Sequence, residues 1–390
     1  MPEIISQRGF ETAEFESRLE SAQRLMADQG LAGILLTTEA EIRYFSGFQT
    51  LFWQSPTRPW FLLLPEAGLP IAVIPEIGAA LMRTTWVKDI RSWSAPCPED
   101  DGISLLQHLL APYAETGSRI GMLKGPETNL RMPLADYERL VESLAGLKIV
   151  DATDVIKSLR QIKSAAEIKK ISSICDIASR AFGEAERIFQ NGQPLIDAFR
   201  AFKIECLMQG ADDVPYLVGG ADQGGYIDVI SPPSSRPLEN GDILMMDTGS
   251  VFDGYFCDFD RNFAIGSADD LSKKAYDVLY RATEAGLKTA RPGVTCAELF
   301  KAMQSVIDEF GDQDGNVGRM GHGLGMQLTE WPSHAAFDQT VLAENMVITL
   351  EPSVGYGDGR IMVHEENVVI RDGEPTLLSA RAAPNLPILT

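Results

Sequence analysis

Apolar residues in the N-terminal part of the chain follow two periods. From Phe15 to Met26 they recur at helical spacing, and the run GLAGILLTT that follows is typical of a buried strand. Strand-like stretches also run from Arg58 to Leu64 and from Leu69 to Ile74. Because helical and strand periods alternate, the pattern predicts a small α/β domain, which we place at residues 1–155.

A second domain is indicated from about residue 156 to residue 390. The segment GLKIVDATDVI is typical of a strand that ends in a turn. Ser164 and Glu167 then have the spacing of a capping box, and isoleucines recur on one side of a long predicted helix from Ile168 to Ile177. We therefore predict that a helix opens the second domain.

Two pairs of strand-like segments in the second domain carry acidic residues. The first pair is DILMMD with YFCDFD, and the second is MVITLEP with IMVHEENVVI. This weak internal symmetry predicts two α/β halves that meet at a shared centre. If YFCDFD is one continuous strand, Asp258 and Asp260 share a face. An edge strand with a solvated acidic face is the alternative.

Composition limits the partners that the protein can have. The 390 residues exceed the usual size of one hydrophobic core, and the formal net charge is −21. So acidic a surface repels nucleic acids and anionic membranes, which favours a small-molecule or peptide ligand. The N-terminal sequence lacks the pattern of a secretory signal, and the apolar region from Phe61 to Met82 is interrupted by prolines and glutamates. We expect a cytoplasmic protein.

Cysteine and serine chemistry finds little support in the sequence. The five cysteines lack paired metal-type spacing and suit reduced thiols, and Cys257 is expected to face away from Asp258. No Gly-x-Ser-x-Gly elbow occurs, and the glycines around His322 do not match the dinucleotide fingerprint. These observations disfavour a nucleophilic triad and a nucleotide site.

Metal chemistry fits the acidic residues better. Four carboxylates and one imidazole occur in strand or turn contexts of the second domain: Asp247, Asp258, His322, Glu351 and Glu365. Taken alone, Asp247 could merely cap a turn, but a glutamate on the apolar face of a strand needs a partner. Two divalent cations would cancel the charge of four carboxylates, whereas one would leave a repulsive cluster.

The ordered motifs MDTG, DFDR, GHGLG, TLEP and HEENVV resemble those of the creatinase/prolidase family (M24) of pita-bread metallopeptidases. The resemblance covers the chain from about residue 155 to its end. The segments IRYFSGF and RQIKSAAEI are similar to the smaller domain of longer family members such as prolidase, aminopeptidase P and creatinase. It implies a creatinase-like N-terminal domain followed by a pita-bread catalytic domain.

By this resemblance, the five residues are the ligands of two metal ions, with Asp258 and Glu365 as bridges. Oxygen-rich ligation with one imidazole suits manganese, iron(II) or cobalt better than zinc. The resemblance also implies a metal-activated water that attacks a carbonyl, with Glu351 as proton acceptor and donor. It implies a homodimer as well.

Four positions depart from the peptidases of this family. Three positions that usually hold histidines hold Ile230, Gly318 and Thr329, and an arginine is replaced by Val363. In the family these residues contact the substrate and help the leaving group depart. Their absence puts ordinary proline-peptide cleavage in doubt, although the ligand set is complete.

Further residues are candidates for the altered substrate site. Asp260 stands where creatinase and ectoine hydrolase place a catalytic glutamate and could ligate metal or move protons, and His334 could replace a lost histidine. Arg58 resembles the arginine by which creatinase grips a carboxylate from the neighbouring subunit, with a surface loop residue as the alternative. Trp53 could wall the same pocket or pack in the core, and Thr329 could contact substrate.

The leading hypothesis is a dinuclear hydrolase that cleaves an amide or related C–N bond in a small, carboxylated substrate. A proline dipeptide and a creatine- or ectoine-like solute are both compatible with it. One rival within the fold is a lyase of the kind that cleaves dimethylsulfoniopropionate. The other is a non-catalytic, peptide-binding pita-bread protein, although such proteins typically lose metal ligands.

Overall fold

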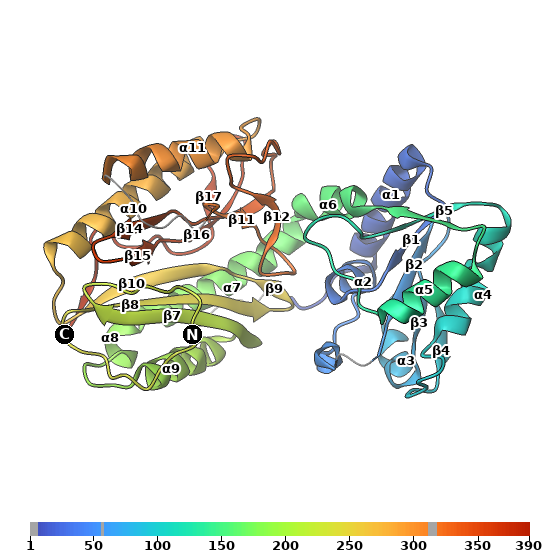
Figure 1. Cartoon of the computed structure of the whole chain (residues 1–390), viewed down its shortest axis with the longest axis horizontal. Coiled ribbons are helices and arrows are strands. Elements are labelled where there is room, and N and C mark those ends of the chain that lie inside the picture. The colour runs from blue at the N-terminus through green and yellow to red at the C-terminus, as the bar shows by residue number, and fades with distance from the viewer. Residues whose placement is uncertain (1–6, 56–57, 311–317) are drawn as a thin grey trace. The chain divides into compact units, whose positions relative to one another are not determined.

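Contacts along the chain divide it into two units, Gln7–Arg160 and Gln161–Thr390 (Figure 1). The computed structural model describes residues 7–55, 58–310 and 318–390. No helix in these ranges is both long and apolar enough to cross a bilayer. Each unit has mixed α/β structure, as the sequence pattern predicted.

The N-terminal unit is built on one six-stranded sheet. Its strand order is β4-β3-β2-β1-β5-β6, with β1 antiparallel to β2 and parallel to β5. The strands are β1 (Gly33–Leu36), β2 (Phe61–Pro65), β3 (Ile71–Pro75), β4 (Asp89–Trp93), β5 (Arg119–Met122) and β6 (Lys148–Asp151). All four residues of β1 are buried, which explains the unbroken apolar run that predicted it.

Helices surround this sheet. They are α1 (Thr12–Gln29), α2 (Glu39–Ser46), α3 (Glu76–Met82), α4 (Ile103–Glu115), α5 (Leu134–Ser143) and α6 (Thr153–Gln161), with the 3-10 turn η1 (Leu51–Gln54). The helical period predicted between Phe15 and Met26 falls inside α1, whose buried face includes both residues. The predicted helix is therefore confirmed.

The first half of the C-terminal unit packs helices on one face of a sheet. Helix α7 (Ala165–Gly183) opens it, and Ser164 and Glu167 form the predicted capping box. With α8 (Ala185–Ile188) and α9 (Leu195–Gln209) it covers the sheet β18-β10-β8-β7, to which β9 is attached (Figure 1). These strands are β7 (Asp213–Gln223), β8 (Asp242–Phe252), β9 (Tyr255–Phe256), β10 (Phe259–Ile265) and β18 (Ile388–Leu389).

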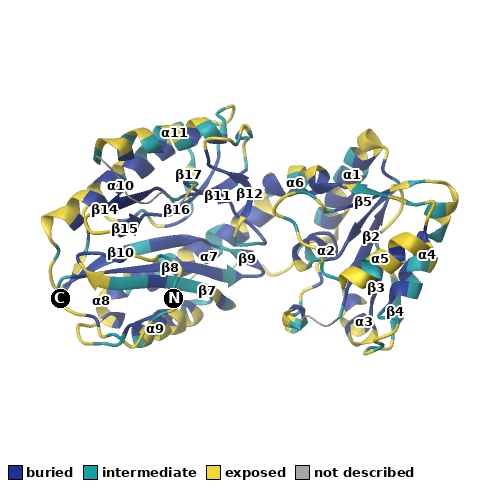
Figure 2. Ribbon diagram, in the orientation of Figure 1, coloured by how far each residue is buried: buried dark blue, intermediate teal, exposed yellow. Residues whose placement is uncertain are grey.

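The second half repeats this arrangement. A sheet of order β12-β11-β13-β16-β17 and the hairpin β14–β15 lie beside the helices α10 (Asp270–Thr289) and α11 (Cys296–Ile307). The turn η2 (Asp308–Phe310) follows α11. The strands are β11 (His322–Gly323), β12 (Glu330–Ser333), β13 (Val347–Leu350), β14 (Ser353–Tyr356), β15 (Arg360–Val363), β16 (Glu366–Val369) and β17 (Thr376–Leu377). Figure 2 shows buried strands in the middle and exposed outer helix faces.

Two local predictions were wrong and one alternative is excluded, in ways that bear on the site. Asp247 does not cap a turn, because β8 continues to Phe252. The expected strand Tyr255–Asp260 is interrupted at residues 257–258, and the strand expected through Glu365 breaks between β15 and β16. In both cases an acidic residue lies in the break, where strand alternation no longer decides where its side chain points.

Candidate metal centre

Five predicted ligands from both halves of the C-terminal unit come together in space. Their ligand atoms form two groups, each with all atoms within 4.8 Å of one another. One group contains Asp258, His322 and Glu351, and the other contains Asp247, Asp258 and Glu365. Asp258 therefore belongs to both groups, as expected of a bridge, whereas Glu365 belongs to one. We call these five residues the ligand cluster.

Four of the five residues of the ligand cluster lie at a strand end or in a break between strands, and the fifth lies inside a strand. Asp247 lies inside β8, whereas His322 is the first residue of β11. Glu351 follows the last residue of β13, and Glu365 precedes the first residue of β16. Strands of both sheets thus deliver their acids to one place, the shared centre that the internal symmetry predicted.

Burial leaves two carboxylate oxygens of the ligand cluster without a partner. Asp247, Asp258, His322 and Glu365 are each at most 8% exposed. Within the described part of the chain, Asp247 Oδ1 and Glu365 Oε2 are buried and accept no hydrogen bond. Since an unpaired buried charge is costly, these oxygens lack a positive partner that a cation would provide.

Three carboxylates of the ligand cluster are harder to ionise than usual. Burial, followed by repulsion from neighbouring carboxylates, raises the pKa of Asp247 and of Glu365 well above the usual range. Burial also raises the pKa of Asp258 to about 6, although His322 acts against it. Divalent cations would reverse these shifts by stabilising the ionised forms.

His322 is oriented for ligation through Nε2. Its Nδ1 lies 2.8 Å from the carbonyl oxygen of Gly323, which can only accept, so Nδ1 carries a proton. Nε2 lies 2.9 Å from Glu351 Oε1 and 3.2 Å from Asp258 Oδ2. Burial disfavours the charged imidazole, but these two carboxylates outweigh burial and raise its pKa to about 10. A metal ion would replace that proton on Nε2.

Glu351 has the opposite electrostatic balance. Burial would raise its pKa, but His322 and the hydroxyl of Thr349 together lower it to about 2. Thr349 Oγ1 donates to Glu351 Oε1 and also accepts the backbone N–H of His322. This buried hydroxyl thus orients two predicted ligands at once.

Asn367 holds the segment that carries Asp258. The backbone N–H of Asp258 donates to Asn367 Oδ1 at 3.0 Å, and Asn367 Nδ2 donates to the carbonyl oxygen of Asp258. Cys175 Sγ lies 3.3 Å from the same Oδ1. Because Asn367 is fully buried in β16, it fixes the interruption between β9 and β10 to the opposite sheet.

Asp260 makes different contacts from those expected of a third reactive acid. Its Oδ1 accepts the backbone N–H of Glu365 at 2.6 Å, and its Oδ2 accepts Asn262 Nδ2 at 2.8 Å. The same Nδ2 donates to the carbonyl oxygen of Val363, and Tyr226 O–H donates to Asn262 Oδ1. Asp260 belongs to neither group of the ligand cluster, and it holds the backbone on which Glu365 lies.

A cavity of about 180 Å³ opens on the ligand cluster. Six side chains outside the ligand cluster line this cavity and are called the rim: Val229, Ile230, Arg319, Leu328, Thr329 and Val363. Tyr216 and Met245 line it as well. Three of the four positions that depart from the family therefore border the cavity, and the fourth, Gly318, is exposed beside Arg319.

The other predicted site residues lie elsewhere. His334 is fully buried, its two ring nitrogens have no partner within the described residues, and it does not line the cavity. Burial lowers its pKa to about 3, so its ring is neutral. Arg58 and Trp53 belong to the N-terminal unit, where Arg131 donates to the carbonyl oxygen of Arg58 at 2.7 Å. Their predicted contact with substrate, and a catalytic role for His334, stay predictions.

Sequence reasoning missed the residues that support the ligands. Thr349, Asn262 and Tyr226 lie on strands or loops whose pairing the motifs do not reveal, so no sequence signal distinguished them. Arg319 did have a signal, because it is a basic residue directly beside the position of a missing family histidine.

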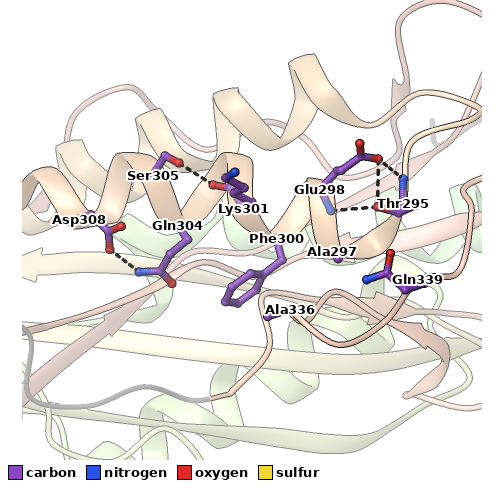
Figure 3. Close-up of a pocket in the computed structure, with 10 residues that line it drawn as sticks. All are labelled: Thr295, Ala297, Glu298, Phe300, Lys301, Gln304, Ser305, Asp308, Ala336 and Gln339. Atoms are coloured by element: carbon purple, nitrogen blue, oxygen red, sulfur yellow. Dashed lines mark hydrogen bonds between the residues drawn. The ribbon is translucent and has the colours of Figure 1, made fainter.

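A second and larger cavity, of about 490 Å³, lies along α11 (Figure 3). Several of its polar side chains are engaged in local hydrogen bonds: Glu298 caps α11 with Thr295, and Gln304 donates to Asp308. Among the described residues, the two groups of the ligand cluster are the sets suited to hold a metal ion, and neither lies here. The smaller cavity is the better candidate site.

Both units are similar to known proteins. A family model described as metallopeptidase family M24 matches residues 169–372, and one described as the creatinase/prolidase N-terminal domain matches residues 18–162. The "Probable dipeptidase PepE" of Mycobacterium tuberculosis is 29% identical over 370 residues, which cover 94% of this chain and 94% of the relative.

The chain is also similar to a second dipeptidase sequence and to a dipeptidase crystal structure. The "Xaa-Pro dipeptidase" of Pyrococcus furiosus is 31% identical over 240 residues, which cover 59% of this chain and 66% of the relative. The crystal structure of dipeptidase PepE from Mycobacterium ulcerans matches with a TM-score of 0.84 at 26% identity, and covers 98% of this chain and 99% of that one. The similarity thus extends over both units.

Proposed function

This chain belongs to metallopeptidase family M24 and is a metal-dependent hydrolase, and we propose that it uses two divalent cations to cleave an amide or related C–N bond in a small, carboxylated substrate. The observation that carries the proposal is the pair of ligand groups that share Asp258. We assign Asp247, Asp258, His322, Glu351 and Glu365 as the ligands.

The donor set fits two cations. Four carboxylates balance two divalent charges, and two of their buried oxygens have no other partner within the described residues. Oxygen donors with a single imidazole favour manganese, iron(II) or cobalt over zinc, which prefers nitrogen and sulfur ligands. We therefore expect one of these three ions in the active protein.

Glu351 is the residue that we propose to move the proton. Bound cations would supply the charge that polarises a carbonyl and lowers the pKa of water. Glu351 lines the cavity, and without metal its pKa is lowered to about 2 by His322 and Thr349 against the effect of burial. In the metal-loaded protein His322 would be neutral, and the bound cations would keep Glu351 ionised. It can accept a proton from the attacking water and deliver it to the leaving nitrogen.

Asp260 is better suited to positioning than to proton transfer. Both of its oxygens already accept hydrogen bonds, one of them from the backbone of Glu365. In this proposal Asp260 keeps Glu365 in place while Glu351 handles the proton. Asp260 is then a positioning residue.

The cavity limits the size of the substrate. At about 180 Å³ it is smaller than the roughly 300–1,000 Å³ of pockets for drug-sized ligands. A dipeptide, an N-acylated amino acid or a compact solute such as creatine or ectoine is the appropriate class. The relatives named dipeptidases favour a dipeptide, whereas Ile230 and Val363 in place of polar family residues favour a modified substrate.

We also propose a homodimer in the cytoplasm. The five cysteines are free thiols and suit a reducing compartment. The dimer is proposed from the family resemblance alone.

A turnover screen tests the proposal. Purified protein is stripped with chelator, reloaded with manganese, iron(II) or cobalt, and assayed with proline dipeptides, N-acyl amino acids and creatine- and ectoine-like solutes. We expect activity that requires metal, with water incorporated into the products. Protein that binds no divalent metal, or activity that chelator leaves unchanged, would refute it, and an alkene product formed without water would identify a lyase.

A further inference from the structure

Arg319 is the arginine that borders the cavity. Among the described residues that line the cavity, it is the one with a permanently positive side chain. The backbone beside it is held at Met320 by two hydrogen bonds. The carbonyl oxygen of Met320 accepts the backbone N–H of Glu351 at 3.0 Å, and the Met320 N–H donates to the carbonyl oxygen of His334 at 2.8 Å. The guanidinium therefore extends from a backbone segment that is tied to the ligand cluster.

The guanidinium has unused hydrogen-bonding capacity. Within the described residues Arg319 has no carboxylate within ion-pair distance, and its hydrogen bond is a long one, 3.5 Å from Nη2 to Thr329 Oγ1. A guanidinium carries five N–H donors in a planar fork that matches a carboxylate. Most of these donors are thus available to a ligand in the cavity.

The positive charge of Arg319 lowers the pKa of two carboxylates of the ligand cluster. Burial is the largest influence on the pKa of Asp258 and of Glu351, and the positive charges of His322 and Arg319 both act against it. Because Arg319 and the five residues of the ligand cluster line the same cavity of about 180 Å³, one small molecule can reach both. The remaining rim side chains, apart from Thr329, are apolar, so an anionic group has one favourable place to bind.

We propose that Arg319 is a specificity-determining residue that binds the carboxylate of the substrate, while Thr329 orients the guanidinium. The inference rests on the proposed hydrolase function and moves the carboxylate-binding role from Arg58 to a residue of the cavity itself. A bidentate pair between Arg319 and the carboxylate would place the bond to be cleaved over the ligand cluster. It also compensates for Val363, which stands where related peptidases have an arginine.

Paired ligands test this assignment through binding as well as turnover. The probes are the N-acetyl derivatives of glycine, alanine and proline and the corresponding N-acetyl amides, which lack the negative charge. Calorimetry with manganese-loaded wild-type protein, R319Q, R319K and R58Q gives the preference for carboxylate over amide. The metal content of each sample is measured in parallel, because it reports on the proposed function independently of Arg319.

We expect wild-type protein and R58Q to prefer the carboxylates, and R319Q to lose about 10- to 100-fold of that preference, the usual range for a hydrogen-bonded charge. R319K should retain part of it, since it keeps the charge without the fork. The assignment is overturned if R319Q keeps the wild-type preference, if R58Q loses it, or if no carboxylate binds metal-loaded wild-type protein. Loss of metal from R319Q would overturn it too, because Arg319 would then serve the ligand cluster. A wild-type protein without metal would instead refute the proposed function.

Discussion

The ligand cluster and the rim are two sides of one cavity, and they differ in how they are supported. Each member of the cluster is buried or nearly so, and the backbone N–H groups of Asp258, His322 and Glu365 donate hydrogen bonds to the side chains of Asn367, Thr349 and Asp260. On the rim, Ile230 is 72% exposed and Arg319 has one long hydrogen bond. The contrast indicates that the metal chemistry is fixed by packing, whereas the substrate contacts can change with few structural consequences.

The strongest way to break this comparison is to remove the shared ligand. We expect Asp258→Asn to abolish binding at both metal positions and to lower activity by roughly 1,000-fold or more, since metal-based charge stabilisation is worth several kcal/mol. Metal analysis and steady-state kinetics give the result. The matched control is Asp270→Asn, because the Asp270 side chain is 95% exposed and should leave both unchanged. A variant with normal metal content and activity would remove Asp258 from the site.

The support behind the cluster should matter nearly as much. Asn367→Ala deletes both hydrogen bonds to the backbone of Asp258, and we expect metal affinity to fall about 10- to 100-fold, as for other residues that orient ligands. Competition with a fluorescent chelator measures the affinity. Thermal unfolding of the loaded variant separates this effect from misfolding, and unchanged affinity in a folded variant would contradict the account.

The sequence could predict the residues of the ligand cluster but not the backbone geometry that positions them. Aspartate, glutamate and histidine in fixed motifs identified the cluster, and helical spacing identified α7 and its capping box. The interruptions at Asp258 and Glu365 were not predictable, because their backbone N–H groups donate to the side chains of Asn367 and Asp260, which are remote in sequence. Local periodicity contains no information about such partners.

Removal of metal should make the protein sensitive to pH. In the metal-free form the pKa of His322 is raised to about 10 by Glu351 and Asp258, which outweigh burial, and burial and repulsion raise those of Asp247 and Glu365. Groups with raised folded-state pKa stabilise the protein below their unfolded pKa, and this contribution is lost as pH rises through the folded value. Because the pKa of His334 is lowered, this residue changes the stability of the protein only below about pH 6.5. It therefore does not oppose the trend at higher pH.

We therefore expect the unfolding temperature of chelator-treated protein to fall by about 3 °C or more between about pH 7 and 8.5, at roughly 2–4 °C per kcal/mol for a unit of this size. In metal-loaded protein His322 would be neutral and the carboxylates ionised throughout, so its unfolding temperature should change less. Differential scanning fluorimetry of both forms measures the difference. Equal pH dependence in the two forms would show that these groups do not hold metal.

The smallest effect is expected on the rim. Thr329 is exposed and makes one long hydrogen bond to Arg319, so Thr329→Ala should raise KM about 2- to 10-fold and leave metal affinity unchanged. Thr329→Ser, which keeps the hydroxyl, is the matched control for steady-state kinetics. If Thr329→Ala instead released metal, the rim and the ligand cluster would not be independent.

Anomalous X-ray scattering from crystals soaked in manganese tests the central claim most directly. The account predicts two peaks for each chain, one among Asp247, Asp258 and Glu365 and the other among Asp258, His322 and Glu351. A single peak, or none, at these side chains would contradict it.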